Sequence, residues 1–354
     1  MKSKKTAPLI IFLIVFFTLI YIILAAKPLG KEFQFTPEWK ISVSAPAIDE
    51  NKESKPTIYF KLGQSLGYFT EDGKVTLYES FPAMASISDY YYSIYSTNST
   101  TIPFYNQKGE LQGSIKTAGY PYFRDNNSYI FLPGGNSFSK VLYNGDTAWT
   151  YEGTLPITAF ASSQKYTAAG FADGKIKLFD NSDGSIAIDF APGGSDYPVI
   201  LGLDISSDGN YIASVSGHEQ QRFVLSQKEN NQQKIIFHYF ISESSPYRTL
   251  VHFTEDNSRV FYLFEGNLGI YNIATEKNYI IPISDRIINI EESEDFVFLL
   301  GKTKSQYTVY MIDKTNTLEG KFSFTADTAF MKTFNNNLYI GNNTSISKIS
   351  LSRG

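Results

Sequence analysis

The sequence contains no cysteine, and it has only three histidines and two tryptophans. Without cysteine the chain can form no disulfide, no thiolate metal site and no cysteine nucleophile. A lipoprotein is excluded as well, because the lipid would have to be carried by a cysteine. If the chain is exported, the absence of disulfides favours a bacterial envelope over a secretory route that uses disulfides for stability.

Positive charge is also scarce outside the N-terminus. The first 31 residues hold five lysines and no acid, which leaves 26 basic against 35 acidic residues in the rest of the chain. Affinity for nucleic acid depends on Lys and Arg that neutralise phosphate. We therefore do not expect a nucleic-acid partner.

The only long apolar run is residues 9–26 (LIIFLIVFFTLIYIILAA), which would span roughly 27 Å as a helix at about 1.5 Å per residue. Three lysines precede it, so the positive-inside rule places the N-terminus in the cytoplasm. We predict a single-pass inner-membrane protein whose main domain lies in the periplasm or outside the cell. A cleaved signal peptide is the alternative. The predicted parts are a cytoplasmic tail (1–8), a transmembrane anchor (9–26), a tether (27–37) and an extracytoplasmic domain (38–354).

Beyond residue 32 no stretch shows helical periodicity, whereas short alternating runs such as Lys175–Phe179 (KIKLF) and Arg259–Phe264 (RVFYLF) recur between polar turns. Glycine supplies the positive φ of several of these turns, as in Asp72-Gly73 and Asp173-Gly174. A proline marks each passage between units, at Pro46, Pro82, Pro121, Pro156, Pro198, Pro246 and Pro282, with Ala326 in the eighth place. Repeats of this length with four strands each predict an all-β protein with a β-propeller fold.

The two tryptophans predict how the ring closes. Trp39 and Trp149 both stand seven residues before a proline, so each is expected in the outermost strand of a unit, where it contributes to blade docking. No unit precedes Trp39, and the chain ends after three strands of its last unit. The N-terminal strand should therefore complete the last blade and remove the open sheet edges.

The number of blades depends on the first unit. Eight unit starts predict eight blades, and Asp49-Glu50-Asn51 is assigned as the turn after the first strand of unit one. Aligning Asp72-Gly73 with Asp173-Gly174 leaves unit one without a fourth strand, so seven blades and an irregular unit are the alternative.

The best unit, Ile157–Gly194, reads ITAFASS, KYTAAGFAD, KIKLFDN, SIAIDFAPGG, and it resembles the repeats of WD40-like and quinoprotein-type (PQQ-like) β-propellers. In the quinoprotein-type family a tryptophan near the end of each blade stacks on the neighbouring blade, which is the role the resemblance implies for Trp39 and Trp149. In architecture the chain also resembles the propeller lipoproteins of outer-membrane assembly, although it lacks their lipidated cysteine. Propellers host unrelated activities, so the resemblance implies architecture more strongly than function.

No motif in the sequence carries a specific chemistry. Gly63–Gly67 (GQSLG) matches a nucleophile elbow but lies between two predicted strands, where that motif needs a strand-to-helix turn. His218 falls in a loop, and His238 and His252 fall within strands without zinc-ligand spacing. Asp180–Gly184 lacks the terminal glutamate of a calcium loop. We therefore predict no catalytic residue, no cofactor and no metal.

The predicted function is a non-catalytic, membrane-anchored scaffold that binds a protein partner in the cell envelope. Tyr90, Tyr91, Tyr92 and Tyr95 form a candidate partner-binding patch, because tyrosine is enriched at interfaces, although core packing is the favoured role for these side chains. One alternative is a hydrolytic or carbohydrate-active enzyme with two carboxylates roughly 5–10 Å apart across the channel mouth. The other is a small-ligand sensor with an apolar pocket in the channel.

Overall fold

The computed structural model describes residues 6–25, 33–44, 46–49, 55–124, 126–230, 232–241 and 245–353. The chain divides into two units, one formed by Met1–Thr36 with Leu351–Gly354 and the other by Pro37–Ser350. Most of the predicted tail and tether lies outside the described residues.

Within its described residues, the first unit contains one helix, α1 (Thr6–Ala25). Among the residues that the structure describes, no helix is both long enough and apolar enough to cross a membrane. The predicted transmembrane helix at 9–26 is therefore not supported.

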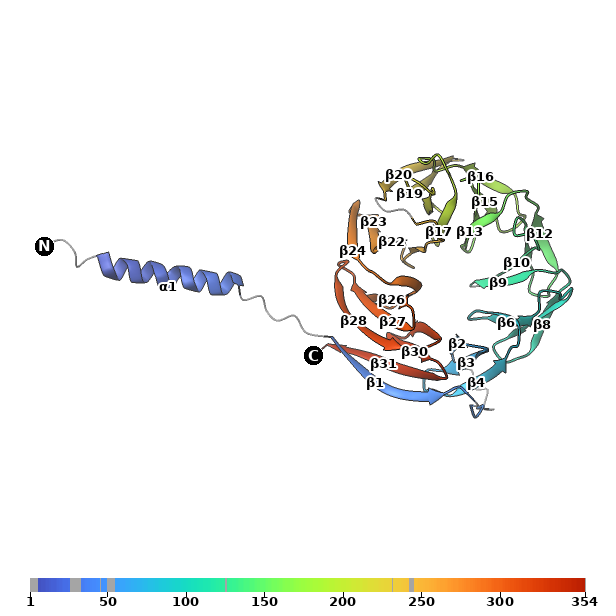
Figure 1. Cartoon of the computed structure of the whole chain (residues 1–354), viewed down its shortest axis with the longest axis horizontal. Coiled ribbons are helices and arrows are strands. Elements are labelled where there is room, and N and C mark those ends of the chain that lie inside the picture. The colour runs from blue at the N-terminus through green and yellow to red at the C-terminus, as the bar shows by residue number, and fades with distance from the viewer. Residues whose placement is uncertain are drawn as a thin grey trace. The chain divides into compact units, whose positions relative to one another are not determined.

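The second unit consists of eight antiparallel sheets arranged in a ring (Figure 1), which confirms the prediction of an all-β propeller with eight blades. In each blade the first strand is innermost, beside the central opening. Blade 2 comprises β5 (Met84–Ile87), β6 (Tyr91–Tyr95), β7 (Ile102–Asn106) and β8 (Leu111–Ile115); blade 3 comprises β9 (Tyr120–Arg124), β10 (Asn127–Phe131), β11 (Phe138–Val141) and β12 (Thr147–Tyr151); blade 4 comprises β13 (Ile157–Ser162), β14 (Tyr166–Phe171), β15 (Ile176–Asp180) and β16 (Ile186–Phe190).

The same order continues through the next blades. Blade 5 comprises β17 (Ile200–Ile205), β18 (Tyr211–Ser216), β19 (Arg222–Glu229) and β20 (Gln232–Phe240); blade 6 comprises β21 (Val251–Phe253), β22 (Arg259–Phe264), β23 (Asn267–Asn272) and β24 (Lys277–Pro282); blade 7 comprises β25 (Arg286–Glu292), β26 (Phe296–Thr303), β27 (Gln306–Asp313) and β28 (Leu318–Thr325).

Blade 8 joins the two ends of the ring. Its strands are β29 (Ala329–Phe334), β30 (Asn337–Asn342), β31 (Ser345–Arg353) and, as the outermost strand, β1 (Phe33–Ser42). Beyond the end of β1, Val43 donates its N–H to the Thr344 carbonyl oxygen (2.7 Å), and Lys348 Nζ lies 2.8 Å from a Glu38 carboxylate oxygen. The strand nearest the N-terminus therefore completes the last sheet.

Among the described residues, blade 1 has three strands, β2 (Thr57–Leu62), β3 (Ser65–Thr70) and β4 (Val75–Ser80), and Asp72-Gly73 lies in the turn between the second and the third. An odd number of antiparallel strands reverses the direction of the chain. β2 therefore runs opposite to the innermost strands beside it: its Lys61 binds Ala85 near the start of β5, and its Tyr59 faces Lys332 near the end of β29.

The expected first turn of unit one is wrong. The first strand of blade 1 starts at Thr57, and Pro46 and Asp49 precede it in the connection from β1. Asp49 donates its N–H to the Val75 carbonyl oxygen (2.9 Å), and Glu50 and Asn51 lie outside the described residues. The physical reason is the reversed direction of β2, which requires the chain to change faces of the ring before the blade begins.

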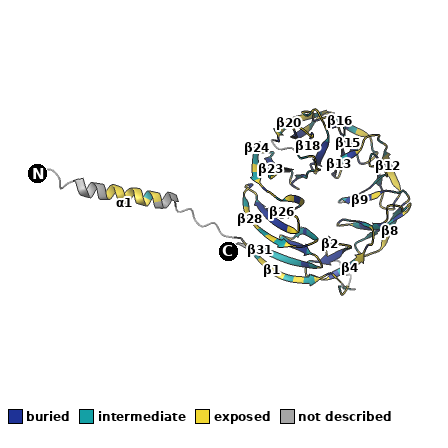
Figure 2. Ribbon diagram, viewed as in Figure 1, coloured by how far each residue is buried: buried dark blue, intermediate teal, exposed yellow. Residues whose placement is uncertain are grey.

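Most of the core lies between neighbouring blades, where buried side chains of adjacent sheets pack together. Figure 2 marks the buried residues along the strands of the ring. Phe223 of blade 5 stacks on Tyr262 of blade 6 with ring centroids 3.8 Å apart, and both side chains are fully buried. We call the side of the ring where the innermost strands of blades 2–8 begin the start face, and the side where they end the end face.

Candidate functional site

The end face is hollowed by a cavity of about 820 Å³. Its walls come mainly from the turns that follow the innermost strands of blades 2, 6, 7 and 8, together with the start of β2. Acidic residues outnumber basic ones in the lining: Asp89, Glu255, Asp256, Glu291, Glu292 and Glu294 against Arg259, Lys314 and Lys332. What this cavity can do chemically depends on how its charged groups are paired.

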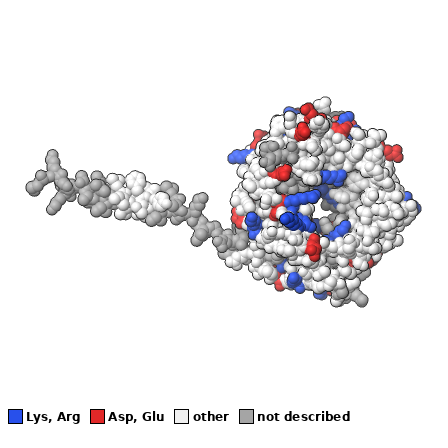
Figure 3. Space-filling model, viewed as in Figure 1, with Lys and Arg blue, Asp and Glu red and all other residues white. Residues whose placement is uncertain are grey.

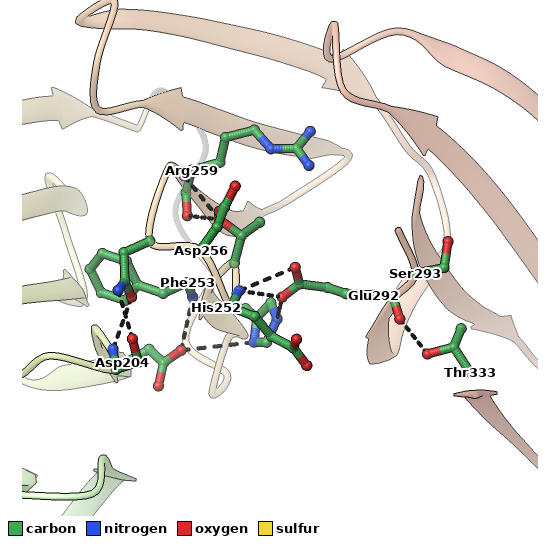
Figure 4. A network of polar contacts seen from close by, with 12 residues as sticks. Asp204, His252, Phe253, Asp256, Arg259, Glu292, Ser293 and Thr333 are labelled. Carbon is green, nitrogen blue, oxygen red and sulfur yellow. Dashed lines mark hydrogen bonds and ion pairs between the residues drawn. The ribbon is translucent and has the colours of Figure 1, made fainter. Parts of the chain in front are cut away.

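One chain of polar contacts links blades 3, 5, 6 and 7, and Figure 4 shows its members in blades 5, 6 and 7. Arg124 Nη2 lies 3.5 Å from Asp204 Oδ1, and Asp204 Oδ2 accepts the Phe253 N–H (2.9 Å) and lies 3.8 Å from His252 Nδ1. The other imidazole nitrogen of His252, Nε2, lies 2.9 Å from Glu292 Oε1. Asp204 is 2% exposed, so its charge depends on these partners rather than on water.

The Glu292 carboxylate also organises the turn of blade 6, because it accepts the Glu255 N–H at 3.1 and 3.2 Å. Beside it, the buried Arg259 donates from Nη1 to the Asp313 carbonyl oxygen (3.0 Å) and to Asn316 Oδ1 (3.2 Å) of blade 7. Burial lowers the pKa of the Arg259 guanidinium, and nearby carboxylates oppose that shift. These contacts tie blade 6 to blade 7.

A second cluster ties blade 7 to blades 8 and 1. Lys332 Nζ lies 3.2 Å from Glu291 Oε1 and 4.4 Å from the centre of the Tyr59 ring. Burial alone would lower the pKa of Lys332, but Glu291, Tyr59 and Asp89 raise it above the ordinary lysine value. Both side chains of the ion pair are largely shielded from solvent, so each needs the other.

Glu291 and Glu292 are neighbours on β25, and adjacent residues of a strand point to opposite sides. Glu291 therefore meets Lys332 of blade 8, whereas Glu292 meets His252 of blade 6. Each carboxylate is engaged with a side chain of an adjacent blade, which suits blade docking better than proton transfer to a substrate. In the part of the chain that the structure describes, no group of three or more His, Asp or Glu is placed to hold a metal ion.

The start face differs in its chemistry. It has a cavity of about 940 Å³ between blades 5, 6 and 7, whose lining includes Leu250, Leu263, Ile287 and two arginines, Arg248 and Arg286. Large apolar side chains are exposed at or just before the innermost strands of five consecutive blades: Tyr120, Leu155, Tyr197, Tyr247 and Ile288. On the face drawn in Figure 3, Lys and Arg side chains gather around the central opening.

The two tryptophans contact the next blade in the same way. Trp39 lies in β1, and its indole N–H donates to the Glu71 carbonyl oxygen of blade 1 (3.2 Å). Trp149 lies in β12, and its N–H donates to the Asn181 carbonyl oxygen of blade 4 (3.1 Å). Each indole covers a glycine with positive φ, Gly73 or Gly184, where a Cβ atom would come within 3.2 or 2.6 Å of the ring.

The two prolines paired with these tryptophans take different places. Pro156 directly precedes β13, whereas Pro46 lies eleven positions before β2 because blade 1 starts late. The alignment of the tryptophans therefore reflects a shared outermost strand, and the alignment of the prolines does not reflect a shared blade start.

The candidate tyrosine patch is divided by strand alternation. Tyr90 is exposed in the turn between β5 and β6 and lines the end-face cavity. Tyr91 packs edge-on against Phe104, Tyr92 is buried against Tyr105, and Tyr95 is buried in the core. Of the four, only Tyr90 is exposed.

The weak motifs occupy ordinary positions. Gly63–Gln64 forms the hairpin turn between β2 and β3, and Ser65 Oγ lies 3.0 Å from the Tyr78 hydroxyl. His218 lies in a loop and His238 in β20. In the Asp180–Gly184 turn, the Asp180 carboxylate accepts the N–H and hydroxyl of Ser182 (2.9 and 2.6 Å).

Sequence reasoning missed the two ionic clusters. Their signal was a charged residue inside an apolar innermost strand, such as Asp204 between Leu203 and Ile205 or Lys332 after Met331. The partners come from strands 40 or more residues away, so no local pattern shows the pairs.

Comparisons with known proteins agree with this architecture. A family model described as a beta-propeller protein matches residues 1–354. A protein of Treponema pallidum (strain Nichols), described as uncharacterized, is 27% identical over 317 residues, which cover 86% of this chain and 84% of that protein.

Two solved structures share the fold. BamB from Moraxella catarrhalis has a TM-score of 0.62 at 12% identity, covering 90% of this chain and 100% of BamB. A chain of the Mitotic Checkpoint Complex has a TM-score of 0.56 at 10% identity, covering 92% of this chain and 94% of that one. At these identities the likeness concerns the fold alone.

Proposed function

Because the chain belongs to the β-propeller protein family, we propose that it is a non-catalytic scaffold that binds a protein partner through the start face of its ring. The observation that carries the proposal is the series of exposed apolar side chains on that face, one at each of five consecutive blades. Exposed apolar groups beside a cavity are typical of protein–protein contact surfaces.

The end face also supports a non-catalytic scaffold. Several of its ionisable residues are engaged with neighbouring blades, as the Glu291–Lys332 and His252–Glu292 contacts show. A closed ring with docked blades offers a rigid surface, and rigidity lowers the entropic cost of binding. Among solved propellers of similar fold, one is a chain of a protein complex, which accords with a partner-binding role.

Attachment to a membrane is the second part of the proposal, and it rests on the sequence alone. Residues 9–26 are almost wholly apolar and follow three lysines, which orients the ring outside the cytoplasm. Fractionation with alkaline extraction tests this part separately from partner binding. Recovery of the full-length chain in the soluble fraction would contradict it.

Site-specific photo-crosslinking in native cells tests the binding face. A photoreactive phenylalanine analogue replaces Tyr197 or Tyr247 on the start face, and the matched control replaces Tyr143, which is also highly exposed but lies in the turn between β11 and β12 on the end face. Both start-face sites should capture the same protein, and Tyr143 should not. Equal capture from Tyr143, or none from either start-face site, would refute the assignment.

A further inference from the structure

Blade 1 is the incomplete blade of the propeller. The other seven sheets have four strands each, whereas blade 1 ends at β4. Among the described residues, one isolated bridge joins the outer edge of β4 to the rest of the chain, between Ile48 and Val75. The fourth-strand position beyond Val75 is therefore open in the described part of the protein.

The hydrogen bonds of β4 show which backbone groups face that position. Phe81 donates its N–H to the Gln64 carbonyl oxygen (2.9 Å), so the backbone N–H of Phe81 points inward, toward β3. In an antiparallel ladder alternate residues point inward and outward, so Tyr78 and Ser80 direct their N–H and C=O groups away from β3. No described strand pairs with those groups.

The connection that precedes β2 stays near the start of β4. Asp49 pairs with Lys74 (3.2 Å) and Lys55 pairs with Asp72 (3.4 Å), so both residues contact the turn between β3 and β4. These pairs hold the connection at one end of the edge, and no described strand covers the outward backbone groups of Tyr78 and Ser80. Glu79 and Ser80 are exposed, and no hydrogen bond or ion pair joins the Glu79 carboxylate to a described residue.

From these observations we infer that blade 1 accepts a fourth strand from another protein. The occupant is an extended segment that runs antiparallel to β4, because only a strand supplies the alternating N–H and C=O groups that match Tyr78 and Ser80. It carries a lysine or arginine opposite Glu79, since opposite charges on paired strands stabilise the pairing. This site is separate from the start face and extends the proposed function to a second contact.

The test uses the full chain and a defined probe. The probe is an acetylated and amidated eight-residue peptide of alternating threonine and valine with one central lysine, and its match replaces that lysine by glutamate. Amide hydrogen exchange of Tyr78 and Ser80 is the readout. Saturating lysine peptide should slow both amides at least about tenfold, and the glutamate peptide should have a smaller effect.

Proline substitution provides the matched controls. Ser80→Pro removes an outward N–H and should abolish the protection of Tyr78 by the peptide. Ile280→Pro changes an equivalent outward position of β24 in blade 6, as the Ile283 N–H to Gly266 oxygen bond (2.9 Å) shows, and should leave the protection intact. Glu79→Lys, which leaves the backbone unchanged, should reverse the preference between the two peptides even if Ser80→Pro impairs folding.

Three results would overturn the inference. These are the absence of protection at Tyr78 and Ser80, equal protection at the outer strands of other blades, and protection by self-association of the chain without peptide. Because the photo-crosslinks from Tyr197 and Tyr247 report on the start face alone, either proposal can fail while the other stands.

Discussion

The two faces of the ring share one backbone fold but differ in the side chains that they carry. On the end face, ionisable side chains of innermost strands and the turns that follow them pair across blades, as Glu291–Lys332 and His252–Glu292 do. On the start face, the corresponding positions expose Tyr197, Tyr247 and other apolar side chains. The paired residues of the end face connect neighbouring blades, and the exposed apolar side chains of the start face are the basis for the proposed binding surface. Substitutions of the paired residues on the end face should therefore change stability, and substitutions of the exposed apolar residues on the start face should change binding.

The largest effect is expected from Lys332→Met. It leaves Glu291 as an uncompensated buried carboxylate, which should lower the free energy of unfolding by about 3–5 kcal/mol. Chemical denaturation measures the change. The double variant Glu291→Gln with Lys332→Met should recover most of the loss, and a loss below about 1 kcal/mol in the single variant would show that the pair does not dock the blades.

Glu292→Gln should have a smaller effect on the same face. It removes the charge that meets His252 Nε2 and weakens the bond from the Glu255 N–H, so we expect a loss of about 1.5–3 kcal/mol. Thermal and chemical unfolding both report it. Asp295→Asn, which changes only an exposed ion pair with Lys314, is the control and should cost less than about 1 kcal/mol.

The faces should also differ in their response to pH. The pKa of Lys332 on the end face is raised, so its contribution to stability is complete below the unfolded lysine value of about 10.4 and is lost as pH rises through the folded value. Comparison of wild type with Lys332→Met between neutral and alkaline pH should show the two stabilities converging only at alkaline pH. Convergence near neutral pH would contradict the raised pKa.

On the start face the sign is reversed at Asp285. Burial alone would raise its pKa, but hydrogen bonds from Thr303, Thr308 and Tyr310 hold it below the ordinary value. Its contribution is therefore present above the unfolded value of about 3.9 and is lost as pH falls through the folded value. Tyr310→Phe, which removes a 2.8 Å hydrogen bond, should make the protein less stable than wild type at neutral pH and reduce that difference in acid. A pH-independent difference would show that the hydroxyl acts through packing only.

The smallest effect on stability is expected from Tyr247→Ala, because the side chain is 70% exposed. The free energy of unfolding should change by less than about 0.5 kcal/mol. Partner affinity, measured with the protein identified by crosslinking, should fall about tenfold or more if the Tyr247 side chain contributes at least about 1.4 kcal/mol to the free energy of binding. Tyr143→Ala is the matched control and should leave the affinity unchanged.

The sequence predicted most of the architecture and little of the charged chemistry. Alternating strands and glycine turns indicated eight unit starts, and the position of Asp72-Gly73 indicated a missing fourth strand in unit one, which left seven blades as the alternative. Each of these signals lies within a few residues. Trp39 and Trp149 indicated their outermost strands for the same reason. Asp204, His252 and Glu292 remained unconnected, since their partners come from different blades and only the folded ring brings them within 4 Å.

The sequence by itself therefore determined the all-β class, the repeat and the absence of cysteine chemistry, all of which follow from composition and local periodicity, whereas it left eight and seven blades open. Only the tertiary structure decided that the three described strands of blade 1 reverse the direction of β2, that the two ionic clusters lie on the end face, and that five consecutive blades each expose an apolar side chain on the start face. The physical reason is that the direction of a strand and the neighbour of a charge depend on how the blades stack. That stacking brings together residues far apart along the chain, and local sequence patterns do not predict such contacts.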